Sequence, residues 1–125
     1  MSAMELGTRL VDLCRAGKNR QAIEELYSDD HVAREAAQMP GMDGREIKGK
    51  AAVLRSNDEF FASTEIHGGS VDGPYPHDDS FIVFMSIDCT PKAGPMKGQR
   101  MDMKEACHYQ VKSGKITRST FYYPM

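Results

Sequence analysis

The sequence predicts an α+β fold in which three helices cover one face of a strongly curved antiparallel sheet. Two patterns support this prediction. Up to about residue 63, apolar residues recur mostly at helical spacing, whereas from Thr64 to the end they alternate with a period of two. The composition, 40% hydrophobic and 27% charged over 125 residues, is typical of a globular chain that buries one core. We therefore expect one domain over residues 1–125.

The three helices follow from apolar spacing and from the residues at their ends. The first is predicted over about residues 3–16 and stops at Gly17. The second is shorter and begins at Asn19, which we expect to act as its N-cap. A third is predicted over about residues 49–63. Their apolar or inner faces carry, in order, Leu6, Leu10, Leu13 and Cys14; Ala22, Ile23, Leu26 and Tyr27; and Val53, Asn57, Phe60 and Phe61.

The strands are predicted from alternation and from the turn residues between them. One short strand is expected early, over 31–37, and is followed by a loop over 39–44. The remaining strands fall in the second half, and Lys112-Ser113-Gly114-Lys115 forms a tight hairpin signal before the last one. Their predicted ranges are 64–72, 81–90, 101–111 and 116–123, with loops over 73–79 and 91–98.

Glu105 interrupts the apolar face of one predicted strand. Every second residue from Met101 to Val111 is apolar except this one, so its carboxyl group should point toward the core. A buried carboxylate needs a partner, a proton or a polar pocket. One interpretation is a structural pair with Arg118 or Asn57; the other is a functional acid.

Composition and motifs exclude several classes of function. With a net charge of −2 and interspersed charges, the chain has no basic surface typical of nucleic-acid binding. No apolar run is long enough for a membrane span, and the N-terminus lacks a signal pattern. We expect a cytoplasmic protein with reduced cysteines, no bound metal and no cofactor, because metal, phosphate-loop and nucleophile motifs are absent. The cysteines are Cys14, Cys89 and Cys107.

Three motifs in this order resemble the SnoaL-like group of the nuclear-transport-factor-2-like superfamily, over essentially the whole chain. They are Leu26-Tyr27-Ser28-Asp29-Asp30 before the first strand, Lys48-Gly49-Lys50-Ala51-Ala52 at the third helix, and Tyr109-Gln110-Val111-Lys112-Ser113-Gly114-Lys115-Ile116 at the last hairpin. The resemblance implies a cone-shaped, strongly bent sheet with an internal pocket, and a homodimer. For the dimer interface we expect the outer face of the sheet, including Lys104 and His108.

Comparison with the steroid Δ-isomerase branch of this superfamily implies a catalytic carboxylate at Glu35. The alternative for Glu35 is an exposed strand-end residue near Arg34 or Lys48. The branch's two oxyanion donors fall at Leu10 and Cys107, which cannot replace them. We therefore do not expect this protein to be a steroid isomerase itself.

The resulting hypothesis is an interior site in which Glu35 and Glu105 act as general base and general acid, or share a proton. Tyr122 and Tyr123 alternate, so one of them should face inward. The substrate would be a small, largely apolar carbonyl compound that is isomerised, dehydrated or cyclised. The alternatives are a non-catalytic module that binds a small apolar molecule, and a dimerising domain. The residues expected to contact the ligand are Asn57, Phe60, Met85, Met103, Cys107 and Tyr122.

Overall fold

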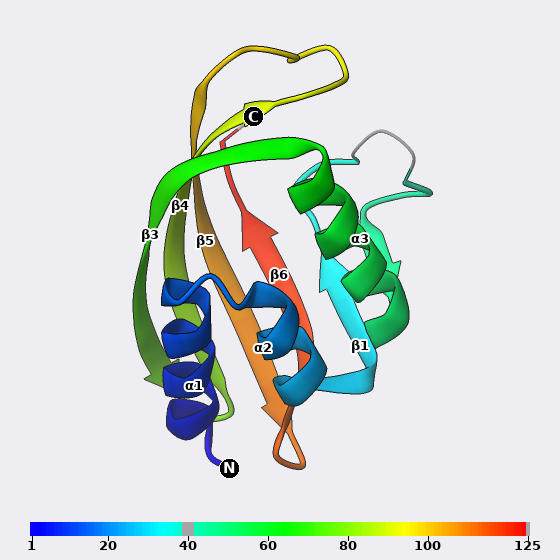
Figure 1. The fold of residues 1–125 in the computed structure, drawn as a ribbon. Helices are drawn as coiled ribbons and strands as arrows, with labels where there is room; N and C mark the ends of the chain where they lie inside the picture. Colours follow the sequence, from blue (N-terminus) through cyan, green and yellow to red (C-terminus); the bar gives the residue numbers. More distant parts are fainter. Residues whose placement is uncertain (39–41, 125) are drawn as a thin grey trace.

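A computed structural model describes residues 1–38 and 42–124 of the chain. Figure 1 shows the helices packed against one face of a single sheet, which we call the inner face; the opposite face is the outer face. The strand order is β2-β1-β6-β5-β4-β3. The elements are α1 (Ala3–Arg15), α2 (Asn19–Leu26), β1 (Tyr27–Arg34), β2 (Glu46–Lys48), α3 (Lys50–Ala62), β3 (Thr64–His77), β4 (Ser80–Pro91), β5 (Met101–Lys112) and β6 (Lys115–Tyr122).

The helices form where the sequence predicts them, although their ends differ in detail. Ser2 caps α1: its hydroxyl accepts a hydrogen bond from the Glu5 backbone, and the Glu5 carboxylate accepts one from the Ser2 backbone. The prediction that Asn19 caps α2 is wrong. Lys18 holds the cap position without a side-chain bond, and Asn19 is already helical.

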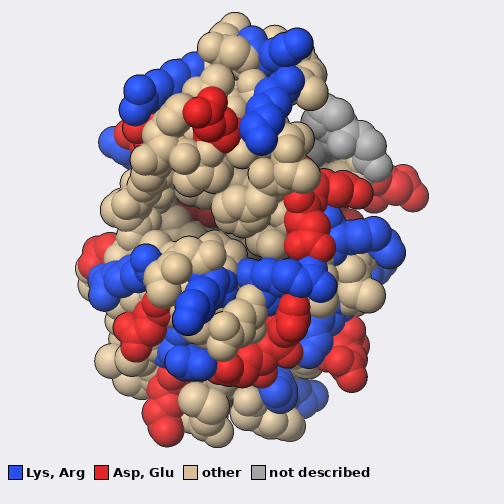
Figure 2. Space-filling model, in the orientation of Figure 1, with Lys and Arg blue, Asp and Glu red and all other residues tan. Residues whose placement is uncertain are grey.

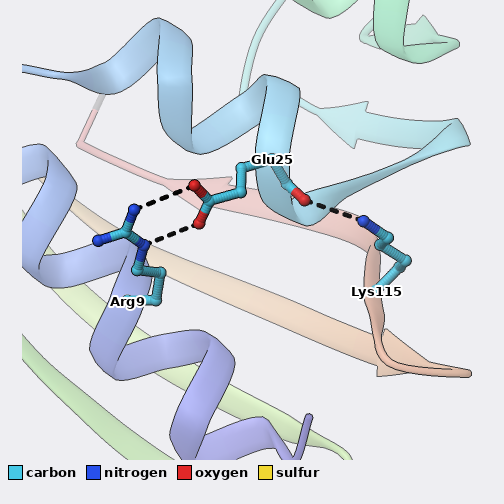
Figure 3. A network of polar contacts seen from close by, with 3 residues as sticks. All are labelled: Arg9, Glu25 and Lys115. Carbon is cyan, nitrogen blue, oxygen red and sulfur yellow. Dashed lines mark hydrogen bonds and ion pairs between the residues drawn. The ribbon is translucent and has the colours of Figure 1, made fainter.

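A polar network on the surface joins two helices to the last hairpin. Arg9 on α1 donates two hydrogen bonds to the Glu25 carboxylate on α2, at 2.7 and 3.0 Å (Figure 3). The Lys115 ammonium donates to the backbone carbonyl of Glu25 at 2.9 Å. Exposed pairs of this kind contribute little free energy each; here they link α2 to α1 and to the first residue of β6.

The sheet is mixed, which corrects the expectation of a purely antiparallel one. Strands β3 to β6 pair antiparallel in sequence order, but β1 runs parallel to β6, and β2 pairs with β1 at the far edge. The sheet curves strongly without closing, and β3 arches over its upper end (Figure 1). A register shift between Ile66 and Gly68 lies within β3 and contributes to this bend. The result is the cone shape that was predicted.

The predicted early strand is displaced, because β1 covers Tyr27–Arg34 rather than residues 31–37. Tyr27 was expected to belong to the second helix. Its backbone is instead extended, and it pairs with Ile116 of β6. This pairing joins residues far apart in the sequence, so local spacing could not reveal it. The sequence also missed β2, whose three residues are too few for periodicity to show. Of the predicted loop over 39–44, residues 39–41 lie outside the described residues.

The predicted loop over residues 73–79 is largely strand, because β3 continues to His77. Tyr75 pairs with Ile82 after a second register shift, and the chain reverses only at Asp78, whose φ is 49°. Proline signals a turn in sequence because it lacks a backbone donor. An edge strand tolerates that loss, and β3 is an edge.

The core lies between the inner face of the sheet and the helices. Helix α1 packs closely on β3, since a Cβ atom on Gly7 would lie only 2.7 Å from Pro74. Burial of this apolar layer supplies the main driving force for folding. Its fully buried members include Leu6, Leu10, Leu26, Phe81, Val83, Cys107 and Ile116.

Candidate functional site

The alternation of β5 places Glu105 on the inner face, as the sequence predicts. Its cross-strand partner is Met85, and the neighbouring pairs on the same face are Val83 with Cys107 and Ile87 with Met103. Figure 2 shows a hollow in the helix-covered side of the molecule, with acidic atoms recessed at its floor. The inner face of the sheet therefore carries a carboxyl group among thioether, thiol and aliphatic side chains.

The surroundings of Glu105 favour its neutral form. Burial raises the pKa of the Glu105 carboxyl group, and the nearby negative charge of Glu35 raises it further, while the adjacent Cys107 thiol partly offsets the rise. The proposed structural pair with Arg118 is not formed. Arg118 lies on the outer face and donates to the Glu46 carboxylate at 3.0 Å.

Glu35 follows the end of β1 and lies close enough to Glu105 for its charge to act on that carboxyl group. Its carboxylate accepts a hydrogen bond from the Tyr123 hydroxyl at 3.0 Å, and its backbone N–H donates to the Arg45 carbonyl at 2.8 Å. Burial raises the pKa of Glu35, and the Tyr123 bond opposes the rise. Glu35 is half-buried, so the alternative of an exposed strand-end residue is wrong. We call Glu35 and Glu105 the carboxylate pair.

Tyr123, and not Tyr122, is the tyrosine of the inner site. Phe121 pairs with Cys107 and shares its face, so Tyr122 points outward and Tyr123 inward. The Tyr122 side chain is 57% exposed. The expectation that Tyr122 lines the interior is therefore wrong, because its side chain lies on the outer face. Burial and the Glu35 charge raise the pKa of Tyr123 to about 12, so its hydroxyl stays protonated and donates.

The other predicted contact residues are distributed over two regions. Met85 and Met103 are half-buried beside Glu105, and Cys107 is completely buried next to them. Asn57 and Phe60 are half-buried on α3, which packs against β1, β2 and α2. The structure thus groups the β4 and β5 residues around Glu105 and leaves the α3 residues near the Glu35 side. A ligand-binding role for each remains a prediction.

A buried histidine network beside the site was not recognised from the sequence. His31 on β1 is completely buried; its Nδ1 lies 2.9 Å from the Ile116 carbonyl oxygen and its Nε2 2.8 Å from the Ser119 hydroxyl. Its ring stacks on Tyr27 at 3.9 Å. The sequence feature that could have revealed this network is a histidine at a strand position where the alternation would place an apolar residue.

The outer face of the sheet carries exposed apolar side chains over its middle strands. A groove of about 420 Å³ lies there. Its lining includes Phe84, Lys104, Ala106 and Tyr122, and Met85 and Glu105 also border it. The Phe84 side chain is 48% exposed and that of Ile82 37%. The homodimer expected through this face stays a prediction.

Two further features bear on the class of protein. None of the helices in the described ranges has the length and apolar character that a bilayer crossing requires. Within residues 1–38 and 42–124, no group of three or more His, Cys, Asp or Glu side chains is arranged to hold a metal ion.

Replacing Glu105 with glutamine tests its raised pKa through stability. Because the folded state holds the proton more tightly than the unfolded state, the wild-type free energy of unfolding falls as pH rises from about 4.5 through the folded pKa. The amide does not ionise. Glu105→Gln should therefore match the wild type near pH 4 and exceed it at pH 8, by about 1.4 kcal/mol per unit of pKa rise. Urea unfolding at both pH values measures this difference.

Glu59 supplies the matched control for this experiment, because it is exposed on α3. Glu59→Gln should change stability little at either pH. A loss of stability in Glu105→Gln at pH 8 would show that the ionised carboxylate makes stabilising bonds, and would contradict this account.

Comparisons with known proteins agree with the architecture. A family model described as a SnoaL-like domain matches residues 1–123. A proposed SnoaL-like polyketide cyclase from Mesorhizobium loti is 36% identical, with a TM-score of 0.89 over 98% of this chain and 100% of that one. None of the curated proteins compared with the chain matches it significantly.

More distant solved structures share the fold alone. A protein of ketosteroid isomerase-like fold from Catenulispora acidiphila, in complex with trimethylamine, is 18% identical, with a TM-score of 0.72 over 99% of this chain and 88% of that one. A proposed SnoaL-like polyketide cyclase from Jannaschia is 14% identical, with a TM-score of 0.71 over 94% of this chain and 82% of that one. The family match over nearly the full length, together with the cone of helices and curved sheet, shows that the chain belongs to the SnoaL-like domain family.

Proposed function

We propose that the chain is a cofactor-independent acid–base enzyme that acts on a small, largely apolar carbonyl compound. The observation that carries this proposal is the carboxylate pair: two carboxyl groups, one just after β1 and one on β5, both have raised pKa values, and the charge of Glu35 acts on Glu105. Raised carboxyl pKa values suit general acid and base catalysis near neutral pH. The family match and the proposed cyclase from Mesorhizobium loti are consistent with such chemistry.

The two carboxyl groups have different surroundings, which gives them different roles. The Tyr123 hydroxyl donates to Glu35 and so favours its ionised form, as a base requires. Within the described residues, the side-chain donor to Glu105 is the weak Cys107 thiol, and the Glu35 charge disfavours ionisation of Glu105. Glu35 is therefore the base and Glu105 the acid.

The reaction step follows from this assignment. The Glu35 carboxylate removes a proton from the carbon next to the substrate carbonyl, and the carbon–hydrogen electron pair moves to form the enol C=C bond. Glu105 delivers its proton to the carbonyl oxygen. The enol hydroxyl then returns its proton to the Glu105 carboxylate as the carbonyl re-forms. In isomerisation the protonated Glu35 gives its proton to a different carbon of a conjugated enol, and in cyclisation the enol carbon attacks a second carbonyl, whose oxygen takes the proton from Glu35. Met85 and Met103 provide an adaptable apolar wall for the substrate.

Proton exchange in D₂O tests this function without knowledge of the natural substrate. A panel of small apolar ketones and β-keto esters is incubated with the protein, and NMR follows loss of the proton next to the carbonyl. The wild type should accelerate exchange for part of the panel. Glu35→Gln and Glu105→Gln should each lower the rate at least about 100-fold, the usual contribution of a general acid or base.

Glu59→Gln is again the control and should catalyse exchange at the wild-type rate.

The alternative function is a non-catalytic module that binds a small apolar molecule, favoured by the half-buried methionines of the inner face. Binding of panel compounds with no accelerated exchange would contradict the enzyme and support this alternative. Mass spectrometry of the same sample would then identify the class of ligand from any apolar molecule that co-purifies with the protein.

A further inference from the structure

A second hollow on the molecule is rich in positive charge, and Glu35 of the carboxylate pair is also among its lining residues. Its volume is about 410 Å³, and three arginines line it: Arg34 at the end of β1, Arg45 just before β2, and Arg118 on β6. We call it the arginine hollow. Sheet pairing explains why these residues converge, because β1 pairs with both β2 and β6.

The charges of the arginine hollow are incompletely balanced. Arg118 donates to Glu46 at 3.0 Å. Within residues 1–38 and 42–124, no carboxylate lies within ion-pair distance of Arg34 or Arg45. Glu35 is the acidic residue that lines the hollow, and its carboxylate accepts a hydrogen bond from the Tyr123 hydroxyl. The hollow therefore holds a surplus of guanidinium groups, which bind planar carboxylate and phosphate groups through paired hydrogen bonds.

The lining also includes Glu35 and Ala36 after β1, and Thr120, Phe121 and Tyr122 on β6. Thr120 pairs with Arg34 across the parallel ladder and shares the outer face, so its hydroxyl adds a neutral donor. Tyr122, 57% exposed, presents a flat aromatic ring. An aromatic ring beside guanidinium groups favours a ligand that has a flat apolar part next to its charge.

We propose that the arginine hollow is a binding site for a small aromatic carboxylate or phosphate. The charged group of the ligand pairs with Arg34 and Arg45, and its ring lies against Tyr122. Arg118 stays paired with Glu46 and adds to the positive potential. The proposal rests on the arginines and on Tyr122, and not on the acid–base role of the carboxylate pair, although Glu35 also lines the hollow.

Titrations with benzoate, phenyl phosphate and inorganic phosphate, at constant ionic strength and followed by ¹H–¹⁵N NMR, test the site. Benzoate or phenyl phosphate should bind saturably and shift the amide signals around Arg34, Arg45 and Tyr122. Comparison of the two probes identifies the preferred charged group. Inorganic phosphate should bind more weakly than phenyl phosphate, because it cannot contact the Tyr122 ring.

Substitutions then locate the binding. Arg34→Ala and Arg45→Ala should each lower the affinity for the preferred probe at least about tenfold, since each removes a charge-assisted hydrogen bond. Arg55→Ala, at an exposed arginine of α3, is the control and should leave binding unchanged. The proposal is overturned if neither aromatic probe saturates, or if Arg34→Ala and Arg45→Ala bind as the wild type does. Equal affinity for inorganic and phenyl phosphate would also contradict it.

Discussion

Replacing His31 with alanine is expected to lower the free energy of unfolding at pH 7 by about 3–4 kcal/mol, the range of large-to-small changes at buried rings. The ring is completely buried. Because a carbonyl oxygen only accepts, Nδ1 donates to Ile116, and Nε2 then accepts from the Ser119 hydroxyl. The substitution removes the stacking on Tyr27 and leaves both partners without their bonds, which adds a desolvation penalty to the cavity.

The pH dependence of this destabilisation distinguishes a buried, neutral histidine ring from a side chain that only fills space. Burial lowers the pKa of His31 below its usual value, so the unfolded state binds a proton that the folded state does not. The wild-type free energy of unfolding therefore falls as pH drops below about 6.5, and the contribution of His31 is complete only above that pH. The difference between wild type and His31→Ala should narrow between pH 7 and pH 5.

Urea unfolding at pH 7, 6 and 5 measures this effect, with His67→Ala as the control. His67 is exposed, with a single 2.8 Å hydrogen bond to the Thr90 hydroxyl. Its substitution should change stability by less than about 1 kcal/mol. If His31→Ala were as stable as His67→Ala, the buried network would not contribute as described.

Replacing Gly69 with alanine should destabilise the protein by about 2–3 kcal/mol, the upper range for atoms forced into a packed site. Gly69 lies where β3 bends over the upper end of the sheet, and it pairs with Ile87 of β4. A Cβ atom at this position would collide with the backbone carbonyl oxygen of Ser86. A backbone group in a sheet cannot move aside as a flexible side chain can, so the β3–β4 ladder itself must shift.

The neighbouring glycine provides a nearly ideal control, because a Cβ atom on Gly68 would have no heavy atom within 4 Å. Gly68→Ala should stay within about 1 kcal/mol of the wild type, since a tolerated alanine reduces the entropy of the unfolded chain. Thermal or urea unfolding of the two variants side by side makes the comparison. Equal stability of Gly68→Ala and Gly69→Ala would show that the bend of β3 does not depend on close contact with β4.

The inward position of Glu105 could be predicted because it follows from alternation within one strand. Period-two alternation is a local property: it fixes which residues share a face without knowledge of any partner strand. The same reasoning located the three helices, the strands near 81–90 and 101–111, and the hairpin after Lys112. The structure confirms these elements to within a few residues.

Where pairing between distant segments decides the outcome, local patterns were insufficient. The sequence placed Tyr122 and Tyr123 on opposite faces but could not say which was inward. The register of β6 against β5 decides this, through the pairing of Phe121 with Cys107. The parallel pairing of β1 with β6 likewise sets the start of β1 at Tyr27 and buries His31 between strands.

By itself, the sequence determined the fold class, the order of nearly all elements and the presence of a carboxyl group on the inner face. The resemblance then pointed to Glu35. Only the tertiary structure showed that Tyr123 donates to Glu35, that the Glu35 charge acts on Glu105, and that Arg34, Arg45 and Arg118 line one hollow. Local spacing fixes the direction of a side chain, whereas the distance between two side chains depends on strand pairing across the whole sheet, which no short stretch of sequence contains.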